Sequence, residues 1–204
     1  MKNAYLVHGF NVWRPSRTVG KLKPYFVDAG FGAKVVRYGW TGLAGLRGVN
    51  DRVAAVLASL SEPGSVGVGH SNGCAILNSA SHLGAKFSGL IYINPALPKN
   101  EVPGPTVKWA HVWHSPSDAP VKWAKWLRRV SPVSWFDPHP WGEMGATGYQ
   151  GDDPRMHNFN KESDFEYQSK EHSDLFADDI LLGFFAPLMA RGAAALTTQE
   201  IFHP

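Results

Sequence analysis

Short, continuously apolar runs alternate with longer amphipathic stretches along most of the chain. Continuous apolar runs are typical of strands that are buried on both faces, as in parallel sheets. We expect such strands at AYLVHG (4–9), AKVVRYGW (33–40), SVGVGH (65–70), SGLIYINPAL (88–97) and VKWAHVWHS (107–115), with a last short strand at DFEYQSK (164–170).

The stretches between these strands repeat their apolar residues every three or four positions, which predicts helices with one buried side. They lie at 16–30, 46–60, 72–83 and 119–130, and a closing helix at 172–193 is expected to kink or end at Pro187. This alternation predicts an α/β fold: a mainly parallel sheet of about six strands with helices on both faces. Ligands of such sheets bind where the strands end.

Residues 131–163 break the alternation, because they are rich in Gly, Pro and Trp and show no period. A long irregular segment in a compact domain often forms a lid or a binding loop. We therefore expect one domain over 1–204 with a lid-like insertion at about 131–163. A surface insertion without a role is the alternative.

Composition narrows the class of protein only modestly. The chain has 204 residues, a formal net charge of +3 and one cysteine, so neither an intramolecular disulfide nor a cysteine-rich metal site is expected. Its charges are mixed along the chain, which does not favour nucleic acid as a partner. The N-terminus lacks the apolar core of a signal peptide, and no apolar run of membrane-spanning length is evident. We expect a soluble, cytoplasmic protein.

The sequence Gly69-His70-Ser71-Asn72-Gly73 stands where the third strand passes into a helix. This is the Gly-x-Ser-x-Gly pattern, in which a sharp, strained turn holds a serine out above the sheet. The two glycines leave room for the strand and the helix to approach. Strand before and helix after are the context that the motif requires, and a plain strand-to-helix turn is the alternative.

With this motif the chain resembles the α/β-hydrolase family over nearly its whole length. The resemblance implies Ser71 as nucleophile, Asp118 as acid and His172 as base, in the family's chain order. His8-Gly9-Phe10 is similar to the family's oxyanion loop, which implies the backbone N–H groups of Phe10 and Asn72 as oxyanion donors. PKNEVPGPT (98–106) is only a connector where larger members carry a cap.

Several alternatives stay open for these roles. Asp118 is also a candidate helix N-cap, Asp137 is a reserve acid, and His114, His139 and His157 are rival bases. Trp13, Trp40 and Trp135 are expected to line a substrate pocket, although core packing is the default for each aromatic residue. Two further groups are weaker candidates: a basic, tryptophan-bearing face with Trp123 and Trp126 for peripheral surface contact, and His139, Asp152, Asp153 and His157 as metal ligands.

Together these features predict a serine hydrolase that cleaves a small carboxylic ester or thioester through an acyl-enzyme on Ser71. The mechanism needs no cofactor and no metal, and the expected partner is a small-molecule substrate. An amidase or lipase with the same residues is an alternative. So is an inactive protein that keeps the fold and binds a partner. The sequence does not specify the oligomeric state.

Overall fold

The computed structural model describes residues 2–10, 14–39, 43–118, 141–166 and 172–199. Its centre is a sheet of six strands in the order β2-β1-β3-β4-β5-β6. All neighbouring strands pair in parallel, which confirms the α/β class. The strands are β1 (Asn3–Val7), β2 (Gly32–Val36), β3 (Ser65–His70), β4 (Phe87–Ile93), β5 (Trp109–His114) and β6 (Met156–Asn160).

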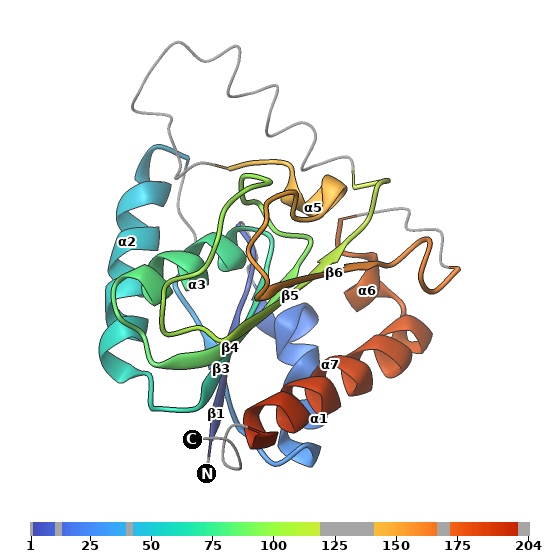
Figure 1. Ribbon diagram of the computed structural model, residues 1–204, viewed down its shortest axis with the longest axis horizontal. Coiled ribbons are helices and arrows are strands. Elements are labelled where there is room, and N and C mark those ends of the chain that lie inside the picture. Colours follow the sequence, from blue (N-terminus) through green and yellow to red (C-terminus); the bar gives the residue numbers. More distant parts are fainter. Residues whose placement is uncertain (1, 11–13, 40–42, 119–140, 167–171, 200–204) are drawn as a thin grey trace.

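Helices cover both faces of the sheet (Figure 1), namely α1 (Lys23–Asp28) and α7 (Asp179–Gln199) on one face and α2 (Leu43–Leu60) and α3 (Asn72–His82) on the other. The side chains of β1 alternate between the two layers. Leu6 joins the core with α1 and α7, whereas Val7 joins the core with α2 and α3. This two-sided burial is why the strands read as continuous apolar runs.

The unusual composition of β3, SVGVGH, follows from how closely α3 packs against it. Val66 and Val68 point into the core on the α1 and α7 side. Gly67 points the other way, and a Cβ there would lie 2.8 Å from a methyl carbon of Leu77 on α3. The glycines of the strand therefore bring α3 close to the sheet at the point where the chain turns into that helix.

The helix expected at 16–30 is divided into three pieces: η1 (Pro15–Arg17), η2 (Val19–Leu22) and α1. Two of these pieces are short 3₁₀ turns. Pro24 stands in the first turn of α1, where its missing N–H is tolerated, so the regular helix begins only at Lys23. Of the apolar residues at helical spacing in this segment, Val19, Leu22 and Phe26 are fully buried and Tyr25 is half-buried.

The predicted irregular segment at 131–163 needs correction at its C-terminal end. Residues 144–147 form the short helix α5, and 156–160 form β6, the sixth parallel strand. The last strand was expected later, at 164–170, but 164–166 are not extended and 167–170 lie outside the described residues. The strand was missed because MHNFN carries polar residues at an edge of the sheet, with His157 and Asn158 exposed.

The closing helix is divided into α6 (Asp174–Ala177) and α7, and α7 continues past Pro187 to Gln199. By length and composition alone, Asp179–Thr198 is apolar enough to cross a membrane, contrary to the expectation that no such run exists. One side of the helix is nevertheless core, since Phe185, Ala186 and Met189 are buried against the sheet. A buried core helix passes the same test of length and hydropathy.

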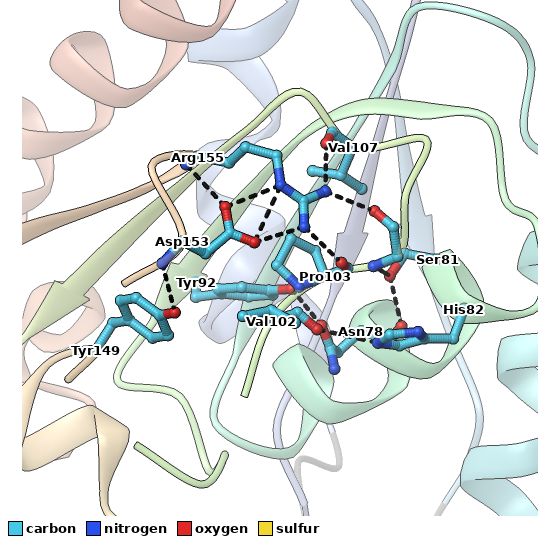
Figure 2. A network of polar contacts seen from close by, with 11 residues as sticks. Asn78, Ser81, His82, Tyr92, Val102, Pro103, Val107, Tyr149, Asp153 and Arg155 are labelled. Atoms are coloured by element: carbon cyan, nitrogen blue, oxygen red, sulfur yellow. Dashed lines mark hydrogen bonds and ion pairs between the residues drawn. The ribbon is translucent and has the colours of Figure 1, made fainter. Parts of the chain in front are cut away.

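The connector between β4 and β5 is fastened to the body of the protein (Figure 2). The Arg155 guanidinium donates to the carbonyl oxygens of Pro103, Gly104 and Val107 and is itself held by the Asp153 carboxylate. The Ser81 hydroxyl of α3 accepts from the Gly104 N–H at 2.8 Å. The segment 98–106, which was expected to be a plain connector without a cap, is therefore fixed against α3.

Candidate active site

Ser71 occupies a strained turn between β3 and α3. Its φ is 54° and its ψ is −121°, a positive φ that a non-glycine residue adopts at an energetic cost. The residue stands at the N-cap position of α3, yet its hydroxyl makes no capping hydrogen bond to that helix. The side chain is partly exposed, whereas its neighbours His70 and Asn72 are buried. The strained turn thus holds Ser71 partly exposed between two buried residues.

Three glycines make this turn sterically possible. A Cβ at Gly73 would lie 2.2 Å from the Val7 carbonyl oxygen, and one at Gly69 would lie 2.8 Å from the Cys74 nitrogen. A Cβ at Gly9 would lie 3.1 Å from the Ser71 Cβ. The His8-Gly9 loop after β1 is therefore packed directly against the serine, as the order of the motifs predicts.

Asp118 and His172 form a hydrogen-bonded pair. The His172 Nδ1 lies 2.8 Å and 2.9 Å from the two carboxylate oxygens of Asp118. The Asp118 side chain is fully buried, and 16% of the His172 side chain is exposed. Because Nδ1 is engaged by the carboxylate, the remaining ring nitrogen, Nε2, is the one available to accept a proton.

The backbone of His172 is tethered to the end of the sheet. Its carbonyl oxygen lies 3.1 Å from the His70 Nε2 and accepts from the Asn94 amide at 3.0 Å. The rings of His70 and His172 have their centroids 4.8 Å apart. His70 immediately precedes Ser71, so this residue links the Asp118–His172 pair to the strained turn.

A buried lysine adds charge next to the pair. Lys161, which follows β6, is 1% exposed, and its ammonium nitrogen lies 3.8 Å from the Asp174 carboxylate. Burial lowers the pKa of Lys161, and the negative charges of Asp174 and Asp118 oppose that shift.

The rival histidines occupy other surroundings. His114 ends β5 and is buried, and burial lowers its pKa. His157 lies in β6 with its ring 5.9 Å from that of His111, so it is a strand residue and not the loop residue that was expected. His139 and the reserve acid Asp137 lie outside the described residues. Among the candidate bases that the structure describes, His172 is the one bonded to Asp118.

The two residues expected to supply oxyanion donors are each next in sequence to a residue of the strained turn: Asn72 follows Ser71, and Phe10 follows Gly9, which packs against Ser71. Asn72 is the first residue of α3, where backbone N–H groups have no partner within the helix. Its buried side chain has a structural role, because it exchanges hydrogen bonds of 3.0 Å and 2.9 Å with the Asn50 side chain of α2. Phe10 follows Gly9, and its ring lies 5.8 Å from that of Trp141.

The predicted pocket tryptophans Trp13, Trp40 and Trp135 lie outside the described residues, as do Trp123 and Trp126. Trp141 is described, and its indole N–H donates to the Asn72 side chain at 2.9 Å. Of the candidate metal ligands, Asp153 is instead bonded to the Arg155 guanidinium. Within the described part of the chain, no three His, Cys, Asp or Glu side chains form a group that could hold a metal.

Sequence reasoning missed Tyr38 and Asn94. The Tyr38 hydroxyl lies 2.7 Å from the His8 carbonyl oxygen and 2.8 Å from that of Gly9. Asn94 has a positive φ of 44° and holds the backbone of His172. Both residues closely follow the ends of strands, on the edge where ligands of parallel sheets bind, and this position was the available clue.

Comparison with solved structures gives a likeness in fold. The crystal structure of a proposed hydrolase of the alpha/beta superfamily from Xanthomonas campestris pv. campestris covers 100% of both chains, with a TM-score of 0.52 and 14% sequence identity. No family model and no curated protein matches the chain. The protein therefore has an α/β-hydrolase fold, and its particular chemistry rests on the geometry of its own residues.

Proposed function

We propose that the protein is a serine hydrolase that cleaves a small carboxylic ester or thioester through an acyl-enzyme on Ser71. One observation carries the proposal: the Asp118–His172 pair is tethered to His70, beside a serine held at φ 54° at the end of a central strand. A plain turn has no need of the strain at Ser71, and a helix cap would use the serine hydroxyl, which α3 does not.

In this mechanism the Ser71 oxygen attacks the carbonyl carbon of the substrate while the His172 Nε2 takes the hydroxyl proton. The buried Asp118 carboxylate holds Nδ1–H and stabilises the imidazolium that forms. The tetrahedral intermediate collapses when the bond to the leaving group breaks. His172 then gives its proton to the departing alcohol or thiol, and the acyl group stays on Ser71.

Water completes the cycle by the same route in reverse. His172 takes a proton from the water, whose oxygen attacks the acyl carbon, and the proton returns to Ser71 as the acid leaves. In both halves negative charge develops on the former carbonyl oxygen. The N–H groups of Phe10 and Asn72 are the proposed donors for it, and loss of one such donor lowers kcat about 10²–10³-fold in a measured case.

A small substrate fits the way in which the connector is held. Residues 103–107 of the link between β4 and β5 are fastened by Arg155 and Ser81 to the body of the protein, which agrees with a plain connector in place of a large cap. The same residues would also suit an amidase or a lipase. Ester and thioester substrates are proposed first because they need the least activation of the leaving group.

A fluorophosphonate probe tests the proposal, because it phosphonylates only a serine that is activated by a neighbouring base. We expect the folded protein to be labelled and Ser71→Ala to be silent. His172→Ala should label at a strongly reduced rate. Ser59→Ala, which changes an exposed serine of α2, is the matched control and should label like the wild type. A folded wild-type protein that takes no label would be a binding protein with this fold, and the proposal would be wrong.

A further inference from the structure

Tyr38 and His8 make an unusual set of contacts around the loop that follows β1. The Tyr38 hydroxyl shares its single proton between the carbonyl oxygens of His8 and Gly9, which lie 2.7 Å and 2.8 Å away. The His8 Nδ1 lies 2.8 Å from the same Gly9 oxygen. The two rings are stacked with centroids 4.0 Å apart and planes 8° apart. The Gly9 carbonyl therefore faces a pair of donors from two different strand ends.

These donors fix more than a carbonyl group. The Gly9 C=O and the Phe10 N–H belong to one planar trans peptide, so they point in opposite directions. Holding the oxygen towards Tyr38 and His8 holds the Phe10 N–H away from them. The Gly9 Cα lies against Ser71, because a Cβ built on it would be 3.1 Å from the Ser71 Cβ. The orientation of this peptide decides whether the side facing the serine offers a donor or an acceptor.

We propose that Tyr38 and His8 are positioning residues that lock the Gly9–Phe10 peptide in the orientation that serves an oxyanion. This inference rests on the proposed function. Glycine rotates freely about its backbone bonds, so a peptide next to Gly9 flips at little steric cost unless it is held. A flipped peptide would present the Gly9 oxygen where negative charge develops, and that would repel the transition state.

The protonation states of the two side chains suit this positioning role. Burial raises the pKa of the Tyr38 phenol far above its usual value, so the hydroxyl keeps its proton and remains a donor. Burial also lowers the pKa of His8, so its ring is neutral near pH 7. A carbonyl oxygen only accepts hydrogen bonds, so the single ring proton of neutral His8 sits on Nδ1.

Tyr38→Phe tests the proposal, because it keeps the ring against His8 and removes only the hydroxyl. We expect kcat for p-nitrophenyl acetate to fall about 10–100-fold with KM within about twofold, less than the loss of a whole oxyanion donor. Affinity for phenylboronic acid, which forms a tetrahedral adduct with serine, should fall by the same factor as kcat. A merely structural role would lower the melting temperature instead and would spare this correlation.

Tyr5→Phe is the matched control, since it removes a tyrosine hydroxyl that donates at 2.8 Å to the Leu60 carbonyl oxygen at a distance from the loop. It should leave kcat and boronate affinity unchanged. His8→Phe, which keeps a flat ring beside Tyr38, is the second variant should Tyr38→Phe fail to fold, and a smaller loss in kcat is expected.

The outcomes separate the two proposals. If wild-type protein is labelled by a fluorophosphonate but the folded variants at Tyr38 and His8 keep the kcat and boronate affinity of the wild type, the positioning role is wrong and the hydrolase stands. If the wild-type protein takes no label, both proposals fall together.

Discussion

The two halves of the candidate site are built in different ways. The half with the proposed nucleophile, Ser71, is fixed by backbone packing: at Gly69 and Gly73 the contacts are closer than any Cβ would permit, and at Gly9 a Cβ would be tight against Ser71. The half with the proposed acid and base, the hydrogen-bonded pair Asp118 and His172, is held by side-chain hydrogen bonds from Asn94 and His70 to the His172 backbone. One half is intolerant of added atoms, whereas the other depends on particular polar groups. Substitutions in the first half should therefore lower stability, whereas substitutions in the second half should lower turnover.

The largest effect is expected in the second half, on turnover. Asp118→Asn keeps the shape of the side chain but disturbs the tautomer of His172, and the same change in the serine protease triad lowers kcat about 10⁴-fold. The melting temperature should change little. Steady-state kinetics with p-nitrophenyl acetate measure the loss.

Glu162→Gln is the control for that change. Glu162 binds the hydroxyl groups of Ser115 and Ser117 in the loop that carries Asp118, so it is also a carboxylate-to-amide change in this loop. We expect a loss below about tenfold, well short of the about 10⁴-fold loss in the triad case. Equal losses in the two variants would mean that the loop needs both carboxylates to fold, and not that Asp118 has a special role.

The first half should fail in stability. Gly73→Ala places a Cβ 2.2 Å from the Val7 carbonyl oxygen, and neither backbone can retreat without moving β1 from α3. The free energy of unfolding should fall by about 3 kcal/mol or more, at or above the usual range for overpacking. Urea denaturation measures it.

Gly48→Ala provides the comparison, because Gly48 lies within α2 and a Cβ there meets nothing within 4 Å. This variant should gain about 0.5–1 kcal/mol from helix propensity. A Gly73→Ala protein as stable as the wild type would show that α3 is not packed against β1 in the way described.

Low pH should also reduce stability, through His70, which links the two halves of the site. Complete burial lowers the pKa of His70 well below its usual value, with the nearby charge of His172 as the next cause. The unfolded chain takes up a proton below about pH 6.5 while the folded chain does not, so stability is present above that pH and is lost as the pH falls. The slope for one such histidine is about 1.4 kcal/mol per pH unit.

His70→Gln, which retains an N–H group at the end of its side chain, should lose about 2 kcal/mol less than the wild type between pH 6.5 and pH 5. His82→Gln, at an exposed position on α3, should follow the wild-type curve. Urea titrations at several pH values compare the three proteins. Parallel curves for all of them would place the acid-sensitive group at His8, His111 or His114, whose pKa values are also lowered by burial.

The smallest effect is expected at Asn94. Asn94→Gly keeps the positive φ of 44° without strain and removes the amide that donates to the His172 carbonyl oxygen at 3.0 Å. We expect kcat/KM to fall about tenfold, which corresponds to about 1.4 kcal/mol, with little change in stability. An unchanged kcat/KM would mean that the His70 contact alone is enough to hold His172 in place.

Most of the fold was predictable because strands that are buried on both faces appear in the sequence as continuous apolar runs. β1, β2, β3, β4 and β5 were all expected from apolar runs, and the motif at Ser71 was found from its strand-to-helix context. β6 was missed because an edge strand with exposed polar residues has no continuous apolar run. The last strand therefore lies at 156–160 and not at the expected 164–170.

The supporting contacts of the site were the hardest to predict. Tyr38 meets Gly9, Trp141 meets Asn72 and Lys161 meets Asp174 only because the folded sheet brings separate segments together. No local spacing in the sequence predicts these contacts. The chain order of Ser71, Asp118 and His172 was readable through the family resemblance, whereas the residues that position them required the three-dimensional structure.

The most direct test of the central claim is to trap the acyl-enzyme. Protein quenched with acid during turnover of p-nitrophenyl acetate, then digested and analysed by mass spectrometry, should carry one acetyl group on Ser71. The group should be absent from Ser71→Ala and should form much more slowly in His172→Ala, which lacks the proposed base. Acetylation at another residue, or acetylation that persists in Ser71→Ala, would contradict the account.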